Sequence, residues 1–117
     1  MAKQFITTPI YYINAKPHIG HAYSTIAADV LARYHRQRGD SVYFTVGTDE
    51  NSQKTLQAVA KRGGGDPQQY SDEMSAVWKQ TWDSLEIGYD QFIRTTSGAH
   101  RSAVEAMIAA VNQRGDI

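Results

Sequence analysis

The sequence predicts an α/β protein in which about three parallel strands alternate with four helices. The first observation is the alternation of two residue patterns along the chain. Short runs of β-branched and aromatic residues, typical of strands, are separated by longer segments whose apolar residues recur every three to four positions, typical of helices. Such alternation favours a parallel sheet with right-handed crossovers. The second observation is size, because 117 residues, 41% of them hydrophobic, suit one folded domain.

The first predicted strand covers residues 4–8 and is stopped by Pro9. A tyrosine-rich loop is expected at 10–16. A helix is then predicted from His18 to the Arg38-Gly39 pair, where basic residues and a glycine mark its end. One stripe of that helix is expected to be buried, formed by Ile19, Ala22, Tyr23, Ile26, Ala27, Val30, Leu31 and Tyr34.

The second strand is predicted at 41–46, a nearly continuous apolar run that is typical of a strand buried on both faces. A short helix at 53–62 follows and ends at three consecutive glycines. A third strand is expected at 92–95 and a last helix at 97–114. The inward side chains of that last helix are predicted to be Val104, Met107, Ile108 and Val111.

The third helix has the clearest start in the chain. Asp66 can cap it, Pro67 suits the first helical position and Gln69 suits the third. Trp78 and Trp82 fall on the apolar stripe that follows, so we interpret both as core residues.

Composition excludes several kinds of site. The absence of cysteine excludes disulfides, a thiolate zinc site, a thiol nucleophile and an iron–sulfur cluster. Lys+Arg and Asp+Glu are equal at 12 each, so the chain lacks the overall basic charge that is typical of nucleic-acid binding. The best candidate for a spanning segment, residues 25–32, is interrupted by Asp29, and the first residues do not resemble a secretory signal. We therefore expect a cytoplasmic protein without membrane contact.

Polar residues gather at the start of the first helix. Pro17 suits the first helical position, but Lys16 is a poor N-cap, so the opening N–H groups are expected to be free to meet an anion. His18 and His21 are three residues apart and project to roughly the same side. Gly20 has no side chain to block a close approach to the backbone. The pattern indicates a phosphate-binding segment.

Alternatives remain open at these positions. The two histidines could instead cap the helix, or could bind a metal together with Asp49 or Glu50. Asp49 and Glu50 follow the second strand, where parallel sheets bind ligands, so at least one carboxylate is expected to bind a cation such as a ligand ammonium or Mg²⁺. A solvated helix start is the other interpretation. Tyr11, Tyr12 and Ile13 could form a pocket wall or belong to the core.

Three segments together carry a family resemblance. Residues 7–21 read Thr-Thr-Pro-Ile-Tyr-Tyr-Ile-Asn-Ala-Lys-Pro-His-Ile-Gly-His, residues 27–34 read Ala-Ala-Asp-Val-Leu-Ala-Arg-Tyr, and residues 47–50 read Gly-Thr-Asp-Glu. They resemble the start of a class I methionyl-tRNA synthetase, in which the His-Ile-Gly-His tetrapeptide is the class I signature. Residues 92–96 and His100 also match. The resemblance implies that residues 1–117 are the N-terminal half of the catalytic domain, the first half of a doubly wound, Rossmann-like sheet of the HIGH superfamily.

The resemblance also implies a reaction. Enzymes of this family form methionyl-adenylate from methionine and ATP, supplied with Mg²⁺, and transfer methionine to tRNA(Met). By resemblance, His18, Gly20 and His21 bind ATP, and the two histidines are catalytic because they bind the phosphates. The resemblance further implies a methionine site formed by Pro9, Ile10, Tyr12 and Asp49, in which Asp49 binds the ammonium group. No metal site is expected within the chain.

Two departures from the family qualify this expectation. Asn51-Ser52 stand where the family usually has His-Gly, and the chain stops at Ile117. The zinc-binding connective region, the Lys-Met-Ser-Lys-Ser loop and the anticodon-binding helices are therefore expected to be absent, together with the remaining half of the catalytic domain. The chain alone is expected to be inactive or very weak. Two alternatives are a non-catalytic adenine-nucleotide-binding fragment and a small nucleotidyltransferase of the HIGH type.

Overall fold

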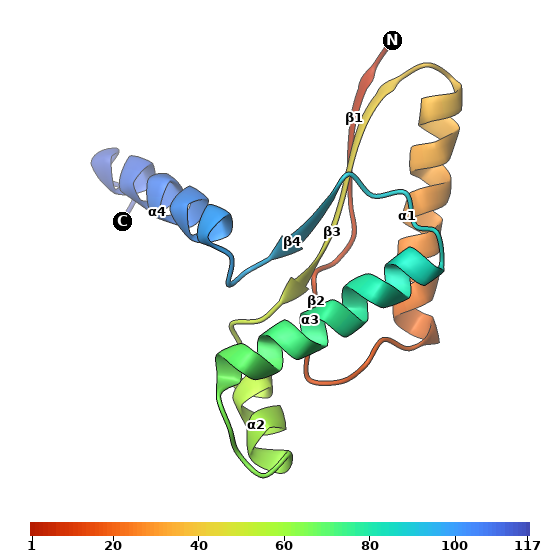
Figure 1. Ribbon diagram of the computed structural model, residues 1–117. Helices are drawn as coiled ribbons and strands as arrows, with labels where there is room; N and C mark the ends of the chain where they lie inside the picture. The colour runs from red at the N-terminus through yellow and green to blue at the C-terminus, as the bar shows by residue number, and fades with distance from the viewer.

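The computed structural model describes residues 1–117 and has the predicted α/β architecture (Figure 1). Strands and helices alternate along the chain, as the sequence pattern indicates. The elements are β1 (Lys3–Thr7), β2 (Tyr11–Tyr12), α1 (Ile19–Gln37), β3 (Ser41–Asp49), α2 (Gln53–Lys61), α3 (Pro67–Ser84), β4 (Gln91–Arg94) and α4 (Gly98–Gln113).

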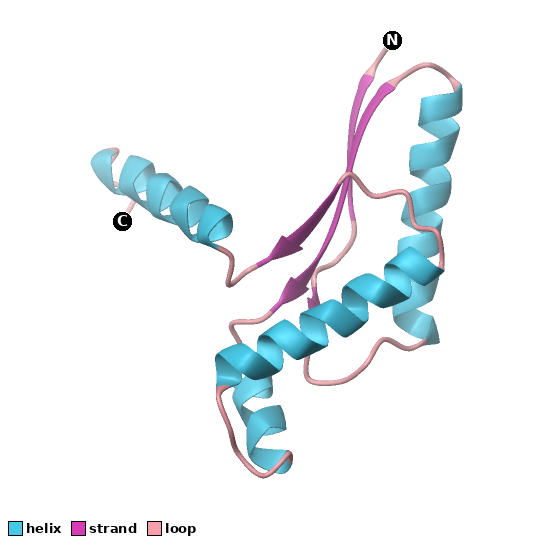
Figure 2. Ribbon diagram, viewed as in Figure 1, coloured by secondary structure: helices cyan, strands magenta, loops and turns pink.

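All the strands are parallel and share β3 as their common partner (Figure 2). β1 pairs with the first half of β3, from Lys3 opposite Ser41 to Thr7 opposite Thr45. β2 pairs with its end, and β4 lies along the other edge. The parallel sheet is therefore confirmed. The tyrosine-rich loop differs from the prediction, because it contributes β2, a strand too short to leave an alternating pattern.

The core lies between the sheet and the helices α1 and α3. It contains eleven buried hydrophobic residues, and the largest of them, Trp78 and Trp82, have no exposed surface. Their interpretation as core residues is confirmed. α3 begins as predicted, with the Asp66 carboxylate accepting the N–H groups of Gln68 and Gln69. No helix is long and apolar enough to cross a membrane.

The buried face of α1 differs from the prediction. The expected stripe is largely exposed, including Ile19, Tyr23, Ile26, Val30, Leu31 and Tyr34. The buried residues of this helix are Thr25, Ala28, Asp29 and Ala32. Small side chains allow α1 to lie close to β3. The Asp29 carboxylate is satisfied there by the Gly88 N–H at 2.8 Å and the Arg33 Nε at 2.6 Å.

Two further burial predictions are wrong. α4 has no buried residue and stands apart from the sheet, so Val104, Met107 and Ile108 are exposed instead of facing a core (Figure 1). β3 is not buried on both faces along its whole length, because Tyr43 is half exposed and stacks on exposed Phe5 with ring centroids 5.9 Å apart. An apolar pattern in the sequence indicates a face that could be buried but does not show whether another element covers it.

Candidate functional site

His18 and His21 form a reciprocal cap at the start of α1. The Nδ1 atom of His18 accepts the Gly20 N–H at 3.1 Å, and the Nδ1 atom of His21 accepts the His18 N–H at 3.2 Å. The helix therefore begins after His18 and not at Pro17, and the predicted free amides are partly occupied. The prediction of free amides failed because an imidazole nitrogen here accepts the backbone N–H, a role that a Ser, Thr or Asp side-chain oxygen usually has. The capping interpretation is correct.

The cap fixes the chemistry of both rings. Because each Nδ1 accepts a hydrogen bond, the proton of each neutral imidazole lies on Nε2. The rings stack with centroids 3.7 Å apart. Burial lowers the pKa of His21, and the neighbouring His18 lowers it further. His21 is thus neutral at pH 7 and offers its Nε2–H as a hydrogen-bond donor.

An aromatic wall supports the His21 ring. Tyr11 and Trp78 lie 4.7 and 4.8 Å from it, measured between ring centroids, and they stack on each other at 5.2 Å. The Tyr11 hydroxyl lies 3.2 Å from the Thr25 Oγ1 and donates to the His21 carbonyl oxygen at 3.3 Å. Tyr11 and Ile13 are buried in the core, whereas Tyr12 is partly exposed. Tyr11 also borders the cavity beside the histidines, so the core and pocket-wall interpretations both apply to this segment.

Helix α3 holds the loop that leads to the histidines. The Tyr70 hydroxyl donates to the Ile13 carbonyl oxygen at 2.9 Å, and the Trp78 Nε1–H donates to the Ala15 carbonyl oxygen at 3.1 Å. These bonds join residues about 60 positions apart in the sequence. Sequence periodicity places both aromatic residues in the core but contains no signal for their polar ends.

A cavity of about 290 Å³ opens beside the two histidines. It brings together four of the predicted site residues, His18, His21, Ile10 and Tyr12. The other lining residues are Tyr11, Asn14, Ala15 and Lys54. Lys54 was not predicted, because a lysine near a helix start has no distinctive pattern. Its Nζ lies 4.0 Å from the centre of the Tyr12 ring.

Three predicted site residues do not line this cavity. Pro9 is exposed on the loop after β1. Asp49 ends β3 directly beside Tyr12, its partner in the strand register, and is half-buried. Gly20 has a local role, because a Cβ atom there would lie 3.0 Å from the Cε1 atom of His18. A side chain at position 20 would therefore crowd the ring that caps α1.

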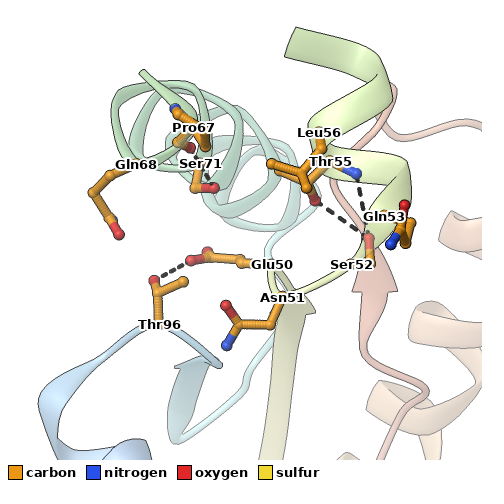
Figure 3. A pocket seen from close by; sticks show the side chains of 10 residues that line it. All are labelled: Glu50, Asn51, Ser52, Gln53, Thr55, Leu56, Pro67, Gln68, Ser71 and Thr96. Atoms are coloured by element: carbon orange, nitrogen blue, oxygen red, sulfur yellow. Dashed lines mark hydrogen bonds between the residues drawn. The ribbon is translucent and has the colours of Figure 1, made fainter. Parts of the chain in front are cut away.

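Glu50 is buried in a polar network that borders a second cavity, and it does not line the cavity beside the histidines (Figure 3). Its carboxylate accepts hydrogen bonds from the hydroxyl groups of Thr48 and Thr96, and from the Arg94 Nε at 2.8 Å and Nη2 at 3.1 Å. The hydrogen bond to Glu50 raises the pKa of Arg94. This second cavity has a volume of about 400 Å³ and lies between the starts of α2 and α3. Glu50 thus fixes the turn after β3.

The alternative of a metal bound by the histidines and a carboxylate finds no matching geometry. No group of three or more His, Cys, Asp or Glu side chains is arranged to hold an ion. Since Glu50 is fully engaged with Arg94 and two threonines, it is not free to serve as a ligand.

Comparison with known proteins identifies the family. The model of the domain described as tRNA synthetases class I (M) matches residues 4–117. The chain belongs to the methionyl-tRNA synthetase family. It is 50% identical to the methionine–tRNA ligase of Thermotoga maritima over 115 residues, which are 98% of this chain and 18% of that protein. The corresponding enzyme of Helicobacter pylori strain J99 is 45% identical over 117 residues.

Solved structures agree with this family in the fold. The structure of Mycobacterium tuberculosis methionyl-tRNA synthetase in complex with methionyl-adenylate matches with a TM-score of 0.85 and 41% identity. The match covers 88% of this chain and 20% of that one. The Rossmann-like α/β fold is confirmed. The chain spans about a fifth of the length of its relatives.

The two residues after Glu50, Asn51 and Ser52, each make a side-chain hydrogen bond. The Asn51 Nδ2 donates to the Thr95 carbonyl oxygen at 3.3 Å, so the turn is tied to β4's end. The Ser52 Oγ accepts the Thr55 N–H at 3.3 Å and caps α2. A glycine at position 52 would have no side chain to supply that cap.

Proposed function

We propose that this chain forms the ATP- and methionine-binding part of the active site of a methionine–tRNA ligase. The complete reaction joins methionine and ATP into methionyl-adenylate and transfers methionine to tRNA(Met). One observation carries the proposal: His18 and His21 are held with their Nε2–H groups as donors beside a cavity that Ile10 and Tyr12 also line. The support from relatives is the family match and the structural similarity to a synthetase solved with methionyl-adenylate.

The histidines act as hydrogen-bond donors in this proposal. The methionine carboxylate attacks the α-phosphorus of ATP, and pyrophosphate leaves. Negative charge spreads over the phosphate oxygens in the transition state, where fixed donors stabilise it most. The lowered pKa of His21 suits this role, because a neutral ring donates from Nε2 without having to gain or lose a proton. Gly20 contributes by leaving the cap of α1 unobstructed.

Methionine binds on the other side of the cavity. Ile10 and Tyr12 contact its apolar end, with Pro9 at the rim of the loop. Asp49 binds the ammonium group from the end of β3, next to Tyr12. A carboxylate and an ammonium form a charge-assisted hydrogen bond, which is stronger than one between neutral groups.

Other parts of the reaction belong outside these residues. The family's ATP substrate is expected to carry Mg²⁺ on its phosphates. In a complete cytoplasmic enzyme, the second half of the nucleotide-binding fold, a zinc-binding connective region and tRNA-binding helices lie in further segments.

Titration calorimetry tests the proposal with three ligands: methionine, ATP and a nonhydrolysable methionyl-adenylate analogue. We expect the analogue to bind more tightly than either substrate, and methionine to bind in preference to glutamate. Binding of ATP without any preference for methionine would favour a non-catalytic nucleotide-binding fragment. Binding of none of the three would contradict the proposal.

A further inference from the structure

Lys54 occupies an unusual place beside the histidine cavity. It lies in the first turn of α2 and lines the cavity that His18 and His21 also line. Its Nζ sits over the ring of Tyr12, 4.0 Å from the ring centre. That distance is within the range of a cation–π interaction, which holds the ammonium group at the cavity and does not neutralise its charge.

No acidic side chain accounts for this placement. The first turn of a helix carries partial positive charge, so a lysine is unfavourable there by about 0.3–1 kcal/mol. The first turn of α2 has no acidic residue, and Lys54 makes no ion pair. Lys79, by comparison, is paired with Asp83 at 2.9 Å. The Tyr12 ring holds the ammonium group in place, but no carboxylate neutralises its charge, which leaves it available to an anionic ligand.

The rest of the cavity makes Lys54 its main source of charge. No Asp or Glu lines the cavity, and the lowered pKa of His21 leaves that ring neutral at pH 7. Two imidazole rings and one ammonium group therefore line a cavity that no carboxylate lines. This combination suits an oxyanion.

We propose that Lys54 binds the carboxylate of the amino-acid substrate. The proposal rests on the proposed function and adds a residue to it. Lys54 lies over Tyr12, on the side assigned to methionine, whereas the histidines are assigned to the phosphates. Its ammonium group donates a hydrogen bond to one carboxylate oxygen and leaves the other oxygen free to face the α-phosphorus. Asp49 and Lys54 then hold the two charged ends of the same zwitterion.

The test compares methionine with methioninol, which keeps the ammonium group and the thioether but has no carboxylate. Binding of both is measured by calorimetry on the unaltered chain, Lys54→Met, Lys54→Arg and Lys61→Met. Lys61→Met is the matched control, since this substitution removes the same charge from the other end of α2. A charge-assisted hydrogen bond is worth enough that Lys54→Met should weaken methionine binding about tenfold or more. Methioninol binding should stay the same, and Lys54→Arg should retain most of the affinity for methionine.

Other outcomes of these measurements would overturn either the role of Lys54 or the proposed function. Equal loss for methionine and methioninol, or loss for ATP instead, would overturn the carboxylate assignment. An effect of Lys61→Met as large as that of Lys54→Met would show a general charge effect and would also overturn it. Failure of the unaltered chain to bind methionine would contradict the proposed function itself.

Discussion

At the scale of single residues, His18 and His21 combine two tasks. Their Nδ1 atoms cap α1, and their Nε2–H groups remain as donors. Replacement by alanine would therefore remove both at once and would cost about 1 kcal/mol of stability for each lost cap. The sequence predicts phosphate binding by the two histidines, and that role remains a prediction, but the cap depends on the side-chain rotamers, which no spacing reveals.

His18→Asn and His21→Gln separate the two tasks. Asparagine is a good N-cap, and glutamine at the third helical position can complete a capping box, so both variants should keep the thermal midpoint close to that of the unaltered chain. Neither provides an imidazole Nε2–H. We expect the double variant to bind ATP about tenfold more weakly or worse, as measured by calorimetry. Unchanged ATP affinity would contradict the role of the rings in binding phosphate.

The lowered pKa of His21 predicts a pH dependence of stability. In the unfolded chain the ring takes up a proton near its usual pKa of 6.5, whereas in the folded chain it resists protonation. Stability from this residue is thus fully present above pH 6.5 and is lost as the pH falls through the folded pKa. The thermal midpoint of His21→Gln should fall less between about pH 7.5 and 5 than that of the unaltered chain. An equal fall in thermal midpoint for the two proteins over this pH range would contradict the predicted effect of His21.

At the scale of elements, strands and helices were more predictable than the faces they bury. Local signals such as Asp66-Pro67 and the glycines after α2 depend only on neighbouring residues, and those boundaries were correct. The prediction of the buried face of α1 was wrong, because its small residues pack on β3 while its larger apolar residues are exposed. Periodicity finds an apolar stripe but does not say which partner covers it.

Gly47 shows how closely β3 and β4 approach. A Cβ atom at this position would lie 2.4 Å from the Ile93 carbonyl oxygen, so Gly47→Ala should force the strands apart and cost about 1–3 kcal/mol. Gly98→Ala is the control, because a Cβ atom there meets nothing within 4 Å. Chemical denaturation measures both. Equal stabilities of the two variants would show that the strands adjust without cost.

At the scale of the whole molecule, the chain has an open shape. Its radius of gyration is 16.5 Å, whereas a compact domain of this length has one of about 13 Å. β1 pairs only with β3, so its other edge carries unpaired N–H and C=O groups beside exposed Phe5. An edge of this kind favours addition of another strand.

We therefore expect the purified chain to self-associate as its concentration rises. Light scattering across a concentration series measures this directly. Phe5→Lys places a charge on the edge strand and should reduce the association. Ile117→Lys places the same charge at an exposed residue outside the sheet and should not reduce it. A clean monomer at high concentration, with slow amide exchange at Phe5 and Ile6, would show that the edge is protected.

The most direct test of the account is nitrogen NMR of the chain labelled at its four histidines. We predict that His18 and His21 carry the proton on Nε2, and that the methionyl-adenylate analogue shifts the Nε2 signals of these two rings. His35 and His100 lie outside the cavity and serve as internal controls whose signals should stay in place. Nδ1 protonation of either cavity histidine, or shifts confined to the control histidines, would contradict the account.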